Sequence, residues 1–210
     1  MINRVELKKN AKEFAYSHKM DIWRPTLVIF CIEFVISFLV SALGIKTGTD
    51  LYSIIGSITT LLMVPLQIGG MSYIFGIIDN KKVDLKECLL SKFKDGSWWK
   101  IILVSFVMGL IVGFGMILLI VPGIYFALKY GMVQMIMADT KHEGKNILYP
   151  LDESSKMMNG QKWDYFVFIL SFFGWFILCG ITLGILYIWI YPYFLVANYY
   201  YYKELKKLAH

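Results

Sequence analysis

Residues 101–138 read IILVSFVMGLIVGFGMILLIVPGIYFALKYGMVQMIMA, and Lys129 is the one charged residue among these 38. A second stretch of the same length, residues 165–202, contains no charged residue. A single helical crossing of a bilayer needs roughly 20 apolar residues. Each stretch is therefore long enough for two crossings, and each is predicted to be a hairpin of two membrane-spanning helices.

The middle of each stretch carries the residues expected to form its turn. These are Pro122-Gly123 in the first stretch and Gly180 to Gly184 in the second. The whole chain of 210 residues is 58% hydrophobic, which is more apolar surface than a soluble domain of this size buries. Barrel strands would alternate polar and apolar residues, whereas these stretches are continuously apolar. The predicted fold class is an all-α membrane protein.

Two further apolar stretches bring the number of predicted spans to six. In chain order the spans are residues 25–45, 51–78, 101–122 and 123–138, and the two halves of 165–202 divided near Gly180. Of the 21 lysine and arginine residues, 19 lie at the termini or in the loops after the second and fourth spans. The positive-inside rule therefore predicts that both termini are cytoplasmic.

Each predicted hairpin follows a candidate amphipathic helix at the cytoplasmic interface. The first covers residues 3–18, the second starts after the capping residue Asp84, and the third starts near Pro150. This order divides the single membrane domain 1–210 into three similar units, 1–78, 79–140 and 141–210. Either the units arose by duplication, or they share only the tryptophans and lysines that any membrane hairpin carries at its boundaries.

Glu33 and Lys129 are the ionisable residues inside predicted spans. Counted along their helices, both lie at a similar depth from the cytoplasmic face. Three interpretations stay open. The two form an ion pair that specifies the fold, they form a proton- or ion-coupled site, or their side chains extend to the interface.

Other polar and small residues in the spans also favour contacts between helices. Gln67 and Gln134 are expected to form interhelical hydrogen bonds, because an unpaired amide in lipid is unfavourable. Gly109, Gly113 and Gly115 predict a close approach of helices. With Asn198, the two glutamines and the two ionisable residues are the only candidates for a polar path through the bundle.

Signatures of catalysis, cofactors and nucleic-acid binding are not found in the sequence. The three cysteines and three histidines are scattered without metal-ligand spacing, so no metal or cofactor is expected. Ser154-Ser155 has no paired histidine and is interpreted as a polar helix face. Asp79 and Asp139 are interpreted as solvated loop charges, and the run Tyr199 to Tyr202 as an interfacial aromatic belt.

The segment VPGIYFALKYGMVQMIMADT and the residues after it resemble an uncharacterised family of bacterial integral membrane proteins, domain of unknown function 975. The matching features run from the Pro-Gly turn to the last helix: Pro122-Gly123, Asp139, Ser155 to Gly160, Ser171 to Trp175, Thr182 to Gly184 and Pro192-Tyr193. The N-terminal LKKNAKEF is similar to the opening helix of the family. The resemblance implies a six-span topology in a bacterial plasma membrane, and no specific activity.

The expected function is that of a non-enzymatic membrane component, with the lipid bilayer and a further membrane protein as candidate partners. The lysine-rich cytoplasmic face suits anionic lipid headgroups. The alternative is a small transporter or channel that uses Glu33 and Lys129. A hydrated cavity that contains either residue would favour transport, and a dry bundle would favour the first role.

Overall fold

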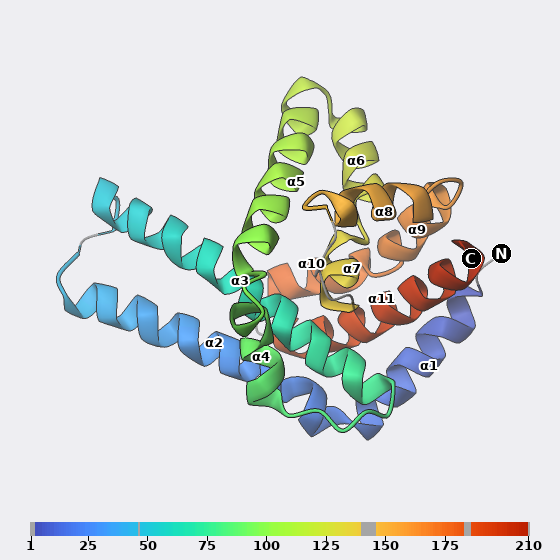
Figure 1. The fold of residues 1–210 in the computed structure, drawn as a ribbon, viewed down its shortest axis with the longest axis horizontal. Coiled ribbons are helices and arrows are strands. Elements are labelled where there is room, and N and C mark those ends of the chain that lie inside the picture. The colour runs from blue at the N-terminus through green and yellow to red at the C-terminus, as the bar shows by residue number, and fades with distance from the viewer. Residues whose placement is uncertain (1–2, 46, 140–145, 183–185, 210) are drawn as a thin grey trace.

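The computed structural model describes residues 3–45, 47–139, 146–182 and 186–209, and the structured part of these ranges is helical (Figure 1). The helices are α1 Arg4–Ser17, α2 Lys19–Ala42, α3 Asp50–Ile78, α4 Leu85–Lys94, α5 Trp98–Leu118, α6 Ile120–Lys129, α7 Val133–Asp139, α8 Tyr149–Met157, α9 Lys162–Leu170, α10 Phe173–Ile181 and α11 Tyr187–Ala209. The all-α prediction is confirmed over these ranges.

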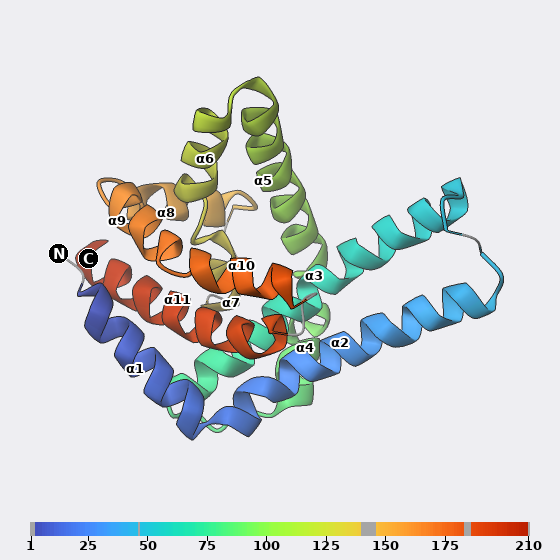
Figure 2. The ribbon, with the colours of Figure 1, turned by 180° about the vertical axis from the view of Figure 1, so that it is seen from behind.

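Two long projections leave a common helical body. α2 and the first half of α3 extend together to one side, and α5 with α6 extends in another direction (Figures 1 and 2). α11 runs through the body beside α1, so the two ends of the chain lie close together. The hydrophobic core lies in the body, and includes the second half of α3, α7 and the second half of α11.

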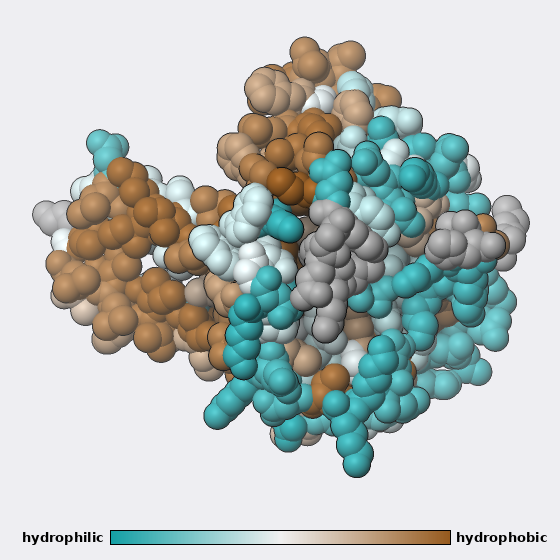
Figure 3. Space-filling model, viewed as in Figure 1, coloured by the Kyte–Doolittle hydropathy of each residue, from teal (hydrophilic) through white to brown (hydrophobic). Residues whose placement is uncertain are grey.

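Five segments of the described chain are helical, long and apolar enough to cross a membrane. They are Lys19–Ala42, Asp50–Ile78, Trp98–Leu118, Ile120–Asp139 and Lys162–Ile181. The sixth predicted span corresponds to α11, and a sixth crossing of the membrane stays a prediction. Gly184, part of the turn predicted before this span, lies outside the described residues. On the face shown in Figure 3, brown, apolar surface covers the two projections, whereas teal, hydrophilic side chains gather on the body.

The turn between the third and fourth spans does not lie at Pro122-Gly123, so that prediction is wrong. α5 ends at Leu118, Leu119 is extended, and α6 starts at Ile120. Proline is compatible with the first turn of a helix because the N–H that it lacks has no intrahelical acceptor there. Gly123 instead allows close packing in the hairpin, since a Cβ on Gly115 would lie 3.0 Å from the Gly123 Cα.

The predicted small-residue contact is therefore confirmed for Gly115 alone among the three glycines of α5. A Cβ on Gly109 or Gly113 would meet no atom within 4 Å.

A second difference is the interruption of the fourth span at residues 130–132, between α6 and α7. Ser154 of α8 is fully buried at this break, where its Oγ donates to the Lys129 carbonyl (2.9 Å) and accepts from the Met132 N–H (3.3 Å). These bonds satisfy backbone groups that the break leaves without helical partners. The interpretation of Ser154 as part of a polar surface is wrong.

The helices predicted before each hairpin are present as α1, α4 and α8. Asp84 caps α4 by accepting from the Glu87 N–H (3.1 Å), and Pro150 lies in the first turn of α8. Their placement at a membrane interface stays a prediction.

Candidate functional site

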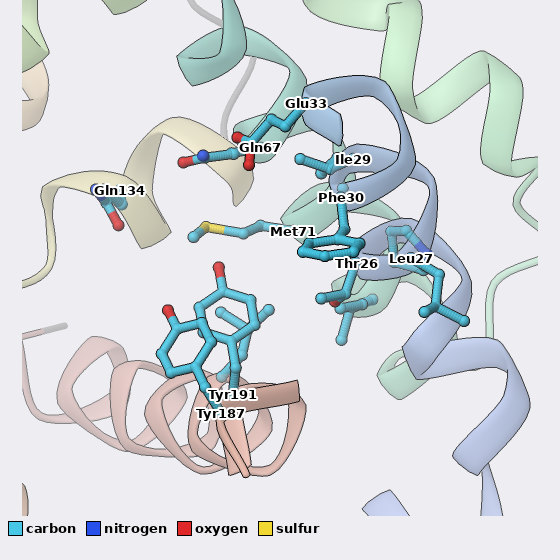
Figure 4. A pocket seen from close by; sticks show the side chains of 14 residues that line it. Thr26, Leu27, Ile29, Phe30, Glu33, Gln67, Met71, Gln134, Tyr187 and Tyr191 are labelled. Atoms are coloured by element: carbon cyan, nitrogen blue, oxygen red, sulfur yellow. The ribbon is translucent and has the colours of Figure 1, made fainter. Parts of the chain in front are cut away.

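A cavity of about 750 Å³ lies where the α2–α3 projection joins the body (Figure 4). Its walls come from four helices, α2, α3, α7 and α11. Its polar side chains are Thr26, Glu33, Gln67, Gln134, Tyr187 and Tyr191. This volume lies within the range of small-molecule sites, which are mostly apolar with a few polar groups.

Glycines of α3 determine the shape of this cavity. Gly70 brings α3 against α2, because a Cβ there would lie 3.3 Å from Ile29 Cδ1 and from Pro25 Cβ. On the other side, a Cβ on Gly69 would lie 2.6 Å from the Cys88 carbonyl oxygen of α4. α3 is thus held tightly between α2 and α4 at one level, and Gln67 lies at the next turn, where the cavity separates the helices.

Three of the four residues proposed from the sequence line this one cavity. Glu33 of α2 and Gln67 of α3 project into the same space, and Gln134 of α7 lies across from them (Figure 4). All three side chains are exposed within the isolated chain. The predicted interhelical hydrogen bonds of Gln67 and Gln134 are not formed between described residues, so their amides are available to a molecule in the cavity.

Lys129, the fourth proposed residue, does not line the cavity. Its ammonium lies 5.3 Å from the ring centroid of the neighbouring Tyr130, and the ion pairs between described residues do not include a Glu33–Lys129 pair. Equal depth along two helices does not make their side chains neighbours, because lateral position and rotation about the helix axis also decide which groups meet. The ion pair, one of the three interpretations left open for these residues, is thus not formed in this structure.

Aromatic residues of the cavity were not singled out from the sequence. Tyr187 and Tyr191 are four residues apart on α11, so they share one helix face, and their hydroxyls point into the cavity (Figure 4). Phe30 of α2 lies opposite α11 in the same view. The i, i+4 spacing of the two tyrosines was the available signal, but many aromatic residues of this chain share such spacing.

A second cavity of about 280 Å³ continues between α2 and α3. It shares Glu33 and Gln67 with the first cavity and is otherwise lined toward the α2–α3 loop by residues that include Tyr52, Thr59 and Thr60. The two cavities together extend along α2 from residue 25 to residue 40. Glu33 and Gln67 therefore lie at the boundary between two hollow regions.

Asn198, the remaining polar candidate, belongs to the packed body. Its Oδ1 accepts from the buried Tyr165 hydroxyl (3.2 Å), and the residue is 5% exposed. Asn198 therefore holds α11 against α9 and does not line either cavity.

Three aspartates fix the C-terminal half of α11 through its tyrosine run. Tyr199 donates to Asp79 (3.1 Å), Tyr202 donates to Asp139 (2.9 Å) and Tyr201 donates to Asp164 (3.0 Å). Each aspartate also pairs with a basic residue: Asp79 with Lys203 (2.7 Å), Asp139 with Lys206 (2.7 Å) and Asp164 with Arg4 (3.5 Å). We call these three sets the tyrosine–aspartate contacts.

The tyrosine–aspartate contacts correct two expectations. Tyr199, Tyr201 and Tyr202 are at most 2% exposed, so they are core residues and not an interfacial belt. Asp79 and Asp139 are partnered and not simply solvated. Burial tends to raise the pKa of Asp79. The hydrogen bond and charge of Lys203, together with the Tyr199 hydrogen bond and the charge of Lys81, outweigh burial and hold this pKa below its ordinary value.

Comparison with known proteins supports the predicted family. A family model described as "Protein of unknown function (DUF975)" matches residues 1–125 and 111–209, two overlapping segments that together span nearly the whole chain. Searches of curated proteins and of solved structures found no match. Within the described residues, no group of three or more His, Cys, Asp or Glu side chains is arranged to hold a metal ion.

Proposed function

The chain belongs to the DUF975 family of proteins of unknown function, and we propose that it binds a small amphiphilic molecule within a membrane without transforming it chemically. The observation that carries this proposal is the cavity in which Glu33, Gln67 and Gln134 meet. Polar groups in hydrocarbon require partners, and these three have none among the described residues.

The rest of the lining supports an amphiphile over water alone. Ile29, Met71, Ile74 and Leu195 contribute apolar surface to the same walls. A molecule with a polar group and an apolar body would contact both kinds of lining. Water alone would keep the apolar walls of the cavity hydrated, which is unfavourable. Phe30 at the edge is 54% exposed in the isolated chain, so a ligand has access from the side of α2.

Passage across the membrane is a second candidate function, favoured by the second cavity. Because Glu33 and Gln67 line both cavities, a molecule held at these residues has hollow space on either side along α2. Flux of the bound amphiphile into liposomes that contain the protein would support this role. Binding without flux would restrict the protein to binding.

The membrane context of the proposal follows from charge and hydropathy. We place the protein in a bacterial plasma membrane with six spans and both termini in the cytoplasm, where its basic residues would contact anionic lipids. A second membrane protein remains a proposed partner. Labelling of Thr47→Cys from outside intact cells by an impermeant thiol reagent tests the orientation; labelling only after lysis would contradict it.

The proposed cavity is tested by filling it. Gln134→Trp adds a large ring at an exposed position of the lining, and Phe38→Trp makes a similar change on α2 outside both cavities. Each variant is purified in native nanodiscs, and bound amphiphiles are identified by mass spectrometry. We expect one class of amphiphile to be enriched over the bulk lipid with the unmodified protein and with Phe38→Trp, and to be lost with Gln134→Trp.

Equal thermal unfolding of the two variants would show that the loss is not a folding defect. Equal enrichment in all three proteins, or none in any, would contradict the proposal.

A further inference from the structure

The charge of the cavity identifies the kind of molecule that fits it. Glu33 is the one charged residue among those that line either cavity. The ion pairs between described residues involve other acids, so no described cation lies within ion-pair distance of its carboxylate. An ionised carboxylate inside a span without a counter-charge is costly, and a positively charged ligand group would offset part of that cost.

The aromatic side chains of the cavity favour the same kind of ligand. Phe30 approaches from α2 and Tyr187 and Tyr191 from α11, on opposite sides of the space below Glu33 and Gln67 (Figure 4). Aromatic faces attract cations, and the attraction is stronger where water is excluded. A carboxylate combined with aromatic rings is thus complementary to an organic ammonium or a similar soft cation.

The same lining disfavours the other charge types. An anionic headgroup would meet Glu33 and find no lysine or arginine among the lining residues. The phosphate of a zwitterionic lipid would face the same unfavourable surroundings. A doubly charged cation would keep one uncompensated charge in a site that offers a single carboxylate.

We infer that the ligand of this cavity is an organic cation with one positive charge and an apolar body, bound with its charged group at Glu33. The inference rests on the proposed binding function and specifies its ligand class. Gln67 and Gln134 add hydrogen-bond acceptors, and the apolar walls hold the body of the ligand. Lys129 lies outside the cavity and takes no part in this recognition.

Tetraphenylphosphonium and tetraphenylborate are suitable probes because they share a shape and differ in the sign of their charge. Each is measured by equilibrium dialysis against the protein in nanodiscs, with empty nanodiscs subtracted for partition into lipid. The variants are Glu33→Gln, which removes the charge at nearly constant volume, and Lys129→Gln, which removes the other intramembrane charge outside the cavity.

We expect saturable binding of the phosphonium to the unmodified protein and to Lys129→Gln, and binding weakened by about tenfold or more in Glu33→Gln, because a desolvated charge partner is lost. The borate should show no saturable binding. Equal binding of the two ions, no saturable binding of the phosphonium, or unchanged phosphonium binding in Glu33→Gln would overturn the inference. These outcomes leave the proposed function standing as long as Gln134→Trp still abolishes the enrichment of a native amphiphile.

Discussion

Polar side chains have different surroundings in two regions of the molecule. One region is the packed body around the C-terminal half of α11, and the other is the cavity beside the N-terminal half of α11. In the body, Ser154 and Asn198 are buried and hydrogen bonded. In the cavity, Glu33, Gln67 and Gln134 have no hydrogen bond or ion pair among the described residues. Polar groups of the body therefore hold the fold together, whereas those of the cavity remain available to a ligand.

This difference changes what a polar residue in a predicted span, such as Gln67, Gln134 or Asn198, indicates. Such residues are costly in lipid and are often functional. In this chain, a structural role belongs to those that the protein itself satisfies, and a binding role is proposed for those that it does not. Four variant pairs, each matched in chemistry, test this account. Three of them test contacts that hold the fold together, and the pair of amides compares the body directly with the cavity.

The largest expected effect is at the helix break that Ser154 supports. Ser154→Ala leaves the Lys129 carbonyl and the Met132 N–H without their partner, which should lower the free energy of unfolding by about 2–4 kcal/mol. Denaturant titration in mixed micelles measures the loss. Ser155→Ala, next to it and half-buried, should change the same free energy by less than about 0.5 kcal/mol. Similar losses in both variants would show that Ser154 does not support the break.

Close packing of α3 against α4 gives the second comparison. Gly69→Ala places a Cβ against the Cys88 carbonyl oxygen and should cost about 1–3 kcal/mol, because backbone on both sides has to move. Gly109→Ala on α5 has open space and should leave stability equal or slightly higher. Thermal unfolding of the two variants measures the difference, and a tolerated Gly69→Ala would contradict the packing of α3 and α4.

Replacing an amide by leucine compares the two regions directly. Asn198→Leu removes the acceptor of the buried Tyr165 hydroxyl and should destabilise the protein by about 1–3 kcal/mol. Gln134→Leu removes an amide without a described partner and should change stability by less than about 0.5 kcal/mol, while it weakens ligand binding. Loss of stability in Gln134→Leu equal to that in Asn198→Leu would remove the distinction between body and cavity.

The smallest expected effect concerns the pH dependence of the Asp79 contact. The pKa of Asp79 is lowered in the folded protein, so the pair with Lys203 stabilises the fold at pH values above the unfolded pKa near 3.8. This stabilisation is lost as the pH falls through the pKa of the folded state. Both groups are partly exposed, which limits the contribution to about 0.5–1 kcal/mol.

Thermal unfolding between pH 7 and pH 3 measures this loss. Asp79→Asn should reduce the decline below pH 4, whereas Asn at the exposed position Asp95 should keep it. An unchanged decline in Asp79→Asn would assign it to other groups.

Features set by local sequence were predictable in this fold. Asp84 capped the expected helix and Pro150 opened another because capping and proline geometry depend on a few neighbouring residues. The turn at Leu119 was misplaced because Pro122 is as compatible with the first turn of a helix as with a turn between helices. Hydropathy alone does not distinguish these two positions.

Features that depend on distant segments were not predictable. The break after Lys129 is supported by Ser154, 25 residues further along the chain, and nothing near the break in the sequence indicates that support. For the site, inspection of charge and polarity found Glu33, Gln67 and Gln134, but not that they share a cavity. Their grouping depends on the packing of four helices. An ion pair between Glu33 and Lys129 was one interpretation of their similar depth, but depth does not determine the lateral position of two helices.

The most direct test of the central claim is an experimental density map of the protein purified with its native lipids. We predict density for a non-protein molecule between α2, α3, α7 and α11, in contact with Glu33, Gln67 and Gln134. A cavity closed by the protein itself, with Glu33 paired to Lys129 or the glutamines bonded to neighbouring helices, would contradict it.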